Sequence, residues 1–119
     1  MEYRYKATLL RVVDGDTIDI DVDLGFGVWL RKQRVRLMGI DTPESRTRNL
    51  AEKELGLAAK ARLIELLSVS QFTIITHKDG KGKFGRILGE PEVDHPQYGK
   101  NNVCDRMIEE GHARSYYGA

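Results

Sequence analysis

Apolar and polar residues alternate without interruption over residues 17–24. In a β-strand, side chains at every second position share one face, so this pattern predicts a strand with one buried face. The apolar face carries Ile18, Ile20, Val22 and Leu24, and the polar face carries Thr17, Asp19, Asp21 and Asp23.

Two further strands are expected on either side of this one. Residues 5–13 are rich in apolar residues, and the Asp-Gly pair in residues 14–16 is typical of a tight turn. Residues 25–27, Gly-Phe-Gly, predict a second turn before a longer third strand over residues 28–40. The first 40 residues therefore predict a β-meander.

A helix is expected next, after a polar loop over residues 41–49. Apolar residues recur every four positions from residue 50 to residue 67, which predicts an amphipathic helix whose stability Gly56 lowers. The apolar stripe consists of Ala51, Leu55, Ala59, Leu63 and Leu67, with Leu66 beside it.

The second half of the chain predicts shorter elements. We expect a fourth strand over residues 72–77, a hairpin tip over 79–83, a fifth strand over 84–89, an irregular loop over 90–100, a short helix over 101–110 and an extended piece over 112–117. The loop is expected because of its two prolines, and the helix because Asn101 and Gly111 suit its ends. The fold class is α+β, mainly β: a five-stranded OB-type barrel with one longer helix between strands three and four and a short C-terminal helix.

Composition limits the possibilities further. A chain of 119 residues suits a single domain, here residues 1–119. A single cysteine, Cys104, excludes an internal disulfide framework and a multi-cysteine zinc site. The charged start of the chain contains no secretory apolar segment, so we expect a cytoplasmic protein. We also expect a monomer without an obligate protein partner.

A net charge of +1 gives no global basic field of the kind that marks many nucleic-acid binders. Acidic residues gather over residues 14–23, and basic residues over 31–36 and 78–86. These clusters indicate either a cation site beside an anion site or a solvated charged face of the sheet.

Two aspartates lie where the predicted strands begin and end. Asp16 opens the second strand and Asp41 closes the third, so both can lie at one end of the meander. Adjacent carboxylates repel each other, and a hard cation with a preference for oxygen ligands removes that repulsion. Taken singly, the two motifs also fit an ordinary hairpin and an Asx turn before Pro43. Together they favour a metal site.

Two arginines and one glutamate complete the candidate site. Arg36 lies in the third strand, on the face opposite Val35 and Leu37, and Arg86 follows the glycine-rich hairpin. Two guanidinium groups near a cation can clamp a phosphate, and Glu44 could accept a proton from water. Each residue alone would also fit a solvated surface position.

Three short motifs occur in an order that resembles the staphylococcal nuclease family over about residues 7–117. They are DGDT, R-x₄-DTPE and K-x-GR. This resemblance implies a calcium-dependent nuclease that hydrolyses DNA, RNA or both at the bond between phosphorus and the 5′-oxygen and leaves 3′-phosphates. It implies Ca²⁺ held by Asp16, Asp41 and Thr42, catalysis by Arg36, Glu44 and Arg86, substrate binding by Lys83, Phe84 and Tyr117, and Asp14 shaping the site.

The sequence departs from the family pattern at Phe84, where the family has a tyrosine, and Tyr117 is preferred over Tyr116 as the base-stacking residue. The alternative function is an OB-type module that binds nucleic acid or protein without cutting. Retention of the acidic and arginine positions favours the enzyme. We expect packing roles for Cys104 and Trp29, and no ligand role for His77, His95 or His112.

Overall fold

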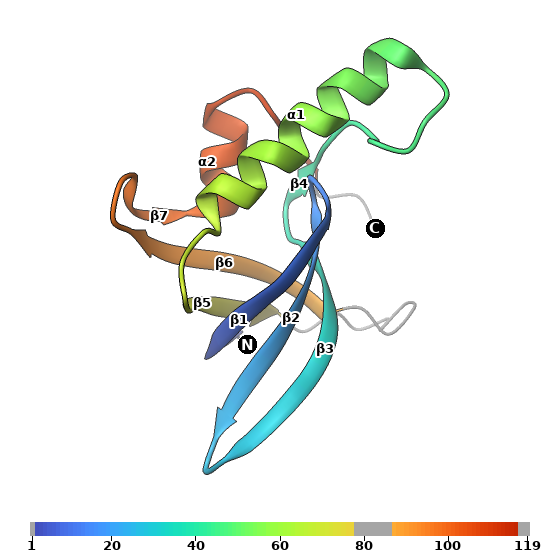
Figure 1. Ribbon diagram of the computed structural model, residues 1–119. Helices are drawn as coiled ribbons and strands as arrows, with labels where there is room; N and C mark the ends of the chain where they lie inside the picture. The colour runs from blue at the N-terminus through green and yellow to red at the C-terminus, as the bar shows by residue number, and fades with distance from the viewer. Residues whose placement is uncertain (1, 78–86, 117–119) are drawn as a thin grey trace.

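Five strands close into a barrel in the computed structural model, which describes residues 2–77 and 87–116 (Figure 1). The strands of this ring are β1 (Glu2–Asp14), β2 (Thr17–Gly25), β3 (Val28–Leu37), β5 (Phe72–His77) and β6 (Ile87–His95). Neighbouring strands pair antiparallel in the order β3-β2-β1-β5-β6, and a parallel pairing of β3 with β6 closes the ring. The expected α+β barrel of OB type is confirmed.

The predicted meander is confirmed in its strands and turns. Ile18, Ile20 and Val22 of β2 are buried, while the aspartates between them stay partly exposed. The turn after β2 places Gly25, Phe26 and Gly27 at positive φ, a conformation that glycine adopts without strain.

The third strand is shorter than expected. β3 ends at Leu37, and Gly39 has a φ of +79°, which turns the chain out of the strand. Ile40–Asp41 forms a separate strand, β4, which pairs with β8 (Arg114–Ser115). The extended piece expected near the end of the chain is therefore present, and it brings Arg114 opposite Asp41.

Helix α1 (Leu50–Leu66) occupies the range expected for it. The Asn49 side chain accepts a hydrogen bond from the backbone N–H of Glu52 and caps the helix. The predicted apolar stripe is wrong in its first half, because Ala51 and Leu55 are exposed. Positions four apart drift by roughly 40° per step around a helix of 3.6 residues per turn. The buried line instead follows Gly56, Ala59, Leu63 and Leu66.

The expectation of an irregular loop over residues 90–100 is wrong. β6 continues to His95 and forms a hairpin with β7 (Gly99–Asn102). Pro91 lacks the N–H that a central strand needs. Pro91 is tolerated because it falls between two pairings of β6. The pairing with β3 ends at Gly89, and the pairing with β7 begins at Glu92. The expected hairpin tip over 79–83, and residues 84–86 of the expected fifth strand, lie outside the described residues.

Helix α2 (Val103–Glu109) begins after Asn102, whose side chain caps it, and ends before Gly111 at a φ of +79°. Its buried residues include Cys104, as expected. Burial raises the pKa of the Cys104 thiol, which favours the packing role expected for this cysteine over a reactive one.

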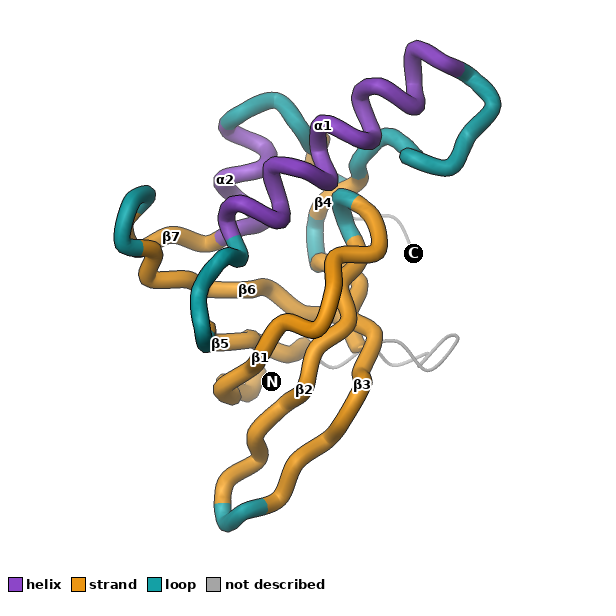
Figure 2. Tube along the Cα trace, in the orientation of Figure 1, coloured by secondary structure: helices purple, strands orange, loops and turns teal. Residues whose placement is uncertain are grey.

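Both helices lie at the end of the barrel where β4 is found, and the β2–β3 hairpin projects from the opposite end (Figures 1 and 2). One cluster of buried apolar side chains joins the barrel to α1 and α2. Among the described residues, no helix has the length and apolar character needed to cross a membrane. The barrel thus presents the Asp14–Asp16 turn, β4 and the start of α1 together.

Candidate functional site

The two candidate metal ligands, Asp16 and Asp41, contact the same guanidinium group. Arg36 Nη2 lies 3.5 Å from Asp16 Oδ2 and 3.6 Å from Asp41 Oδ1. The prediction that the two strand ends bring these carboxylates together is therefore correct, although Asp41 belongs to β4 and not to β3. A positive charge already lies between the two acids.

Asp16 is held by a short network of its own. Its Oδ1 accepts a hydrogen bond from Thr17 Oγ1 at 3.0 Å, and its Oδ2 accepts one from the backbone N–H of Thr42 at 3.3 Å. Its backbone carbonyl accepts from the N–H of Leu37 at 2.8 Å. These contacts fix the carboxylate against β3 and the residue that follows β4.

The donor set at this point suits a hard cation. Two carboxylates converge beside Thr42, and the buried Thr42 Oγ1 has no hydrogen-bond partner. Oxygen ligands of this kind, completed by backbone carbonyls and water, are those that Ca²⁺ accepts. Within residues 2–77 and 87–116, no three His, Cys, Asp or Glu side chains form a metal-binding group, so the carboxylate contribution is limited to two.

Arg36 is oriented by its own strand. It is flanked by the buried Val35 and Leu37, as strand parity predicted, and its side chain is only 17% exposed. Its Nη1 donates to the carbonyl of Leu37 at 3.0 Å and to that of Asp16 at 3.5 Å. A guanidinium held in this way is preorganised, so it would lose less conformational freedom on binding a planar or tetrahedral anion.

Glu44 is exposed, and the loop that carries it is anchored at two points. Ser45 Oγ donates to Asp14 Oδ1 at 2.8 Å, which ties this loop to the first turn. A Cβ added at Gly56 would lie 2.5 Å from the carbonyl carbon and oxygen of Glu44, so only glycine allows α1 to approach the loop this closely. Asp14 thus supports the loop and does not join the pair of converging carboxylates.

Four predicted site residues, Lys83, Phe84, Arg86 and Tyr117, lie outside the described residues. Tyr116, the alternative position for the late tyrosine, is described. Its ring centroid lies 6.0 Å from the guanidinium carbon of Arg36, and its backbone N–H donates to the carbonyl of Gly39. The end of the chain therefore reaches the site through Tyr116.

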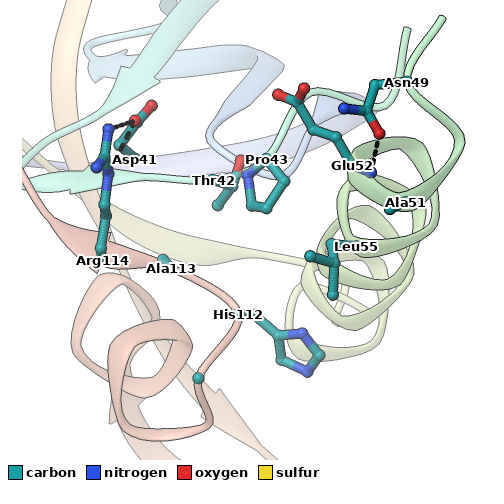
Figure 3. A pocket seen from close by; sticks show the side chains of 11 residues that line it. Asp41, Thr42, Pro43, Asn49, Ala51, Glu52, Leu55, His112, Ala113 and Arg114 are labelled. Carbon is teal, nitrogen blue, oxygen red and sulfur yellow. Dashed lines mark hydrogen bonds and ion pairs between the residues drawn. The ribbon is translucent and has the colours of Figure 1, made fainter. Parts of the chain in front are cut away.

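Arg114 is a site residue that the sequence analysis missed. Its Nη2 and Nε lie 3.0 and 3.3 Å from Asp41 Oδ2, so Asp41 lies between two guanidinium groups (Figure 3). The contact depends on the pairing of β4 with β8, which joins residues 73 positions apart. No local pattern around Arg114 could have shown it.

Most of the acidic cluster on β2 is a charged sheet face and not a cation site. Asp19 pairs with Arg34 and Arg11, and Asp21 pairs with Arg31. The hydrogen bond from Arg34 is the main reason why the pKa of Asp19 is lowered. Asp16 from the acidic cluster and Arg36 from the basic cluster over residues 31–36 lie at the candidate site, where they contact each other.

His95, His77 and Trp29 each contact other side chains or backbone groups of the fold. His95 is buried, and its Nδ1 accepts hydrogen bonds from the backbone N–H groups of Gln97 and Tyr98. His77 contacts Glu90 at 2.7 Å, and the guanidinium of Arg31 stacks over Trp29. His112 differs, because it lines a cleft beside the site (Figure 3).

Comparison with known proteins identifies the family. Residues 34–119 match the family described as "Staphylococcal nuclease homologue". The chain belongs to this family. It is 37% identical to thermonuclease from Staphylococcus intermedius over 90% of the chain and 57% of the relative. It is 33% identical to endonuclease YncB from Bacillus subtilis, over 94% of the chain and 48% of that relative. It is 29% identical to thermonuclease from Staphylococcus hyicus, over 98% of the chain and 61% of that relative. The chain therefore spans about half to six-tenths of the length of these relatives.

Proposed function

We propose that this staphylococcal nuclease homologue is a calcium-dependent nuclease that hydrolyses phosphodiester bonds in DNA, RNA or both. One observation carries the proposal: Arg36 contacts both Asp16 and Asp41, at 3.5 and 3.6 Å. The two proposed cation ligands and a guanidinium suited to bind phosphate thus lie together, and the Glu44 loop follows Thr42 directly. The nuclease names of the relatives support the same reading.

Asp16, Asp41 and the backbone carbonyl of Thr42 would hold the ion. Bound there, Ca²⁺ supplies neutralisation of the phosphodiester charge. The two carboxylates, which contact one guanidinium group beside Thr42, support this assignment. Arg36 and Arg114 together balance the charges of the two acids, so a cation would have to displace the exposed Arg114 from Asp41.

Each remaining residue has a distinct role in the proposed reaction. Arg36, with Arg86 as the second guanidinium, binds the non-bridging phosphate oxygens and stabilises the charge that develops in the transition state. Glu44 orients the attacking water and accepts its proton. Water attacks phosphorus in line, the bond to the 5′-oxygen breaks, and the product carries a 3′-phosphate.

The test is digestion of plasmid DNA and of RNA with calcium, with magnesium and with chelator. We expect cleavage with calcium and none with chelator. Magnesium should support little turnover, because it demands stricter octahedral geometry than a mixed carboxylate, carbonyl and water site offers. Full activity in chelator would refute the metal site.

A matched pair of variants tests the residue roles. Glu44→Gln keeps the shape and removes the base, so the turnover rate should fall by roughly 10²-fold or more. Glu54→Gln changes an exposed glutamate on α1 and should leave the rate unchanged. Nucleic-acid binding without any calcium-dependent cleavage by the wild type would instead favour the non-catalytic binding module.

A further inference from the structure

A cleft of about 510 Å³ opens directly beside the Asp41–Thr42 segment (Figure 3). One wall is the segment from Gly111 to Arg114, and the other is the first two turns of α1. Its volume falls within the range of about 300–1,000 Å³ that small-molecule sites occupy. It lies outside the proposed catalytic residues except at Asp41 and Thr42.

The cleft combines the groups that a nucleotide needs. The Arg114 side chain is 78% exposed at one end. Figure 3 shows Leu55 projecting from α1 into the cleft, with the imidazole of His112 next to it. Leu55 is 61% exposed, so its apolar surface has no cover within the described chain. An aromatic ring beside an apolar side chain offers a base a stacking surface.

Polar groups at the α1 end suit the edge of a base. Glu52 lines the cleft there, and its carboxylate can accept hydrogen bonds from base amino and imino groups. Asp41 at the other end is negative, but Arg36 and Arg114 contact its two oxygens. These contacts offset the negative charge of Asp41, so a phosphate can approach the Arg114 end of the cleft.

The segment that carries His112 and Arg114 is rigidly placed. The backbone N–H groups of His112 and Ala113 both donate to the carbonyl of Met107, at 3.0 and 3.1 Å. Pairing of β8 with β4 holds Arg114 opposite Asp41. The backbone positions that carry the His112 ring and the Arg114 guanidinium are thus fixed relative to each other, as a subsite for one nucleotide requires.

We propose that this cleft is a subsite for the nucleotide next to the scissile phosphate, with Arg114 binding its phosphate and His112 stacking on its base. The assignment rests on the proposed nuclease function for its biological meaning. The binding itself can be measured without any cleavage, because a mononucleotide has no phosphodiester bond to hydrolyse.

The test is an NMR titration of the whole chain with thymidine 3′-monophosphate and with thymidine 5′-monophosphate. We expect at least one of them to shift the amide signals of Leu55 and of residues 111–114 in a saturable way. Inorganic phosphate alone should bind much more weakly at these positions. Equal affinity for phosphate and nucleotide would show a simple anion contact and overturn the subsite.

Variants then separate the two contacts. Arg114→Ala should weaken the nucleotide about five-fold, as expected for an exposed charge pair. Arg31→Ala is the matched control, since Arg31 is also exposed and pairs with an aspartate at 3.0 Å, but near the start of β3, away from Arg36. An equal effect of both variants would overturn the role of Arg114.

His112→Ala should weaken the nucleotide about tenfold, and His112→Phe should restore most of the affinity because the ring remains. Thermal unfolding of each variant confirms that it is folded. No loss in His112→Ala, or shifts confined to residues outside the cleft, would overturn the subsite. If nucleotides bind here as expected but the wild type cuts no nucleic acid, the subsite stands and the proposed nuclease function fails.

Discussion

At the scale of single residues, the affinity of the proposed site for a cation depends on which charged side chains contact its carboxylates. Asp41 shares one oxygen with Arg36 and the other with Arg114, so two guanidinium groups compete with any cation for this carboxylate. Arg36 is nearly buried, whereas Arg114 is exposed and free to leave. Arg114 would therefore oppose the proposed cation binding at Asp41.

Arg114→Ala should tighten calcium binding about three- to tenfold, because a positive charge 3.0 Å from a ligand carboxylate disappears. Calorimetry with calcium chloride, in the absence of nucleic acid, measures the change. Arg31→Ala removes the same charge at the far end of the molecule and should leave the affinity unaltered. Weaker calcium binding in Arg114→Ala would show that Arg114 does not compete for Asp41.

At the scale of elements, α1 holds the Glu44 loop through one close backbone contact. A helical glycine normally costs about 1 kcal/mol relative to alanine. At Gly56, however, a Cβ would lie 2.5 Å from backbone atoms of Glu44, which cannot move without shifting the loop. The same glycine that weakens the helix thus positions the proposed base.

Gly56→Ala should therefore destabilise the protein by about 1–3 kcal/mol, as an overpacked position does, and lower the turnover rate. Urea denaturation and a cleavage assay measure the two effects. Ala58→Gly, at an exposed position of the same helix, reports helix propensity alone and should leave turnover intact. A more stable and fully active Gly56→Ala would contradict the close contact.

The two helices are joined by an ion pair that makes their packing pH-dependent. Glu110 accepts hydrogen bonds from Arg62 at 2.6 and 2.9 Å and from Arg106 at 2.6 Å. The bonds from Arg62, followed by those from Arg106, lower the pKa of Glu110 from its ordinary 4.5 to about 2. A lowered carboxylate pKa stabilises the fold above the ordinary value, and this stabilisation is lost as pH falls toward 2.

Glu110→Gln should cost about 1 kcal/mol in the free energy of unfolding at pH 6, the upper range for a partly exposed pair. The difference from wild type should shrink between pH 4.5 and pH 2, where the wild-type carboxylate also loses its charge. Urea denaturation at pH 6 and pH 3 tests this. Glu109→Gln, at the neighbouring exposed position, is the control. A difference that does not change with pH would exclude Glu110 as the titrating group.

At the scale of the whole molecule, stability and function occupy different parts of the structure. The core extends from the barrel to α1 and α2, and Leu63 is fully buried in it. The proposed site lies at the rim, on turns, on β4 and at the end of β3 that carries Arg36. A core substitution should therefore reduce stability without altering the chemistry.

Leu63→Ala should lower the free energy of unfolding by about 2–5 kcal/mol, the usual cost of a buried leucine. The turnover rate of the folded fraction should stay unchanged. Ile64→Ala, one residue further along α1, removes a side chain that is 47% exposed and should cost about 1 kcal/mol or less. Equal losses for both variants in urea denaturation would show that α1 does not pack through Leu63.

The sequence by itself determined the three strands of the meander with their turns, strand β5 and the main helix, because these depend on local periodicity and on residues such as Gly25 and Gly27. It also indicated the meeting of Asp16, Arg36 and Asp41, since a meander returns to the same end. It failed at residues 90–100, where β6 and β7 form a hairpin. Pro91 fits there because it falls between the pairing of β6 with β3 and that of β6 with β7, and the local sequence shows neither pairing.

Only the tertiary structure decided which face of α1 is buried, why Gly56 is needed and that Arg114 contacts Asp41. Each of these depends on segments that lie far apart along the chain. The Asp41–Arg114 pair spans 73 positions, and it forms because β8 returns to β4 after the barrel is complete. A periodic pattern reports the neighbours of a residue along its own element, but it carries no information on what another element places against it.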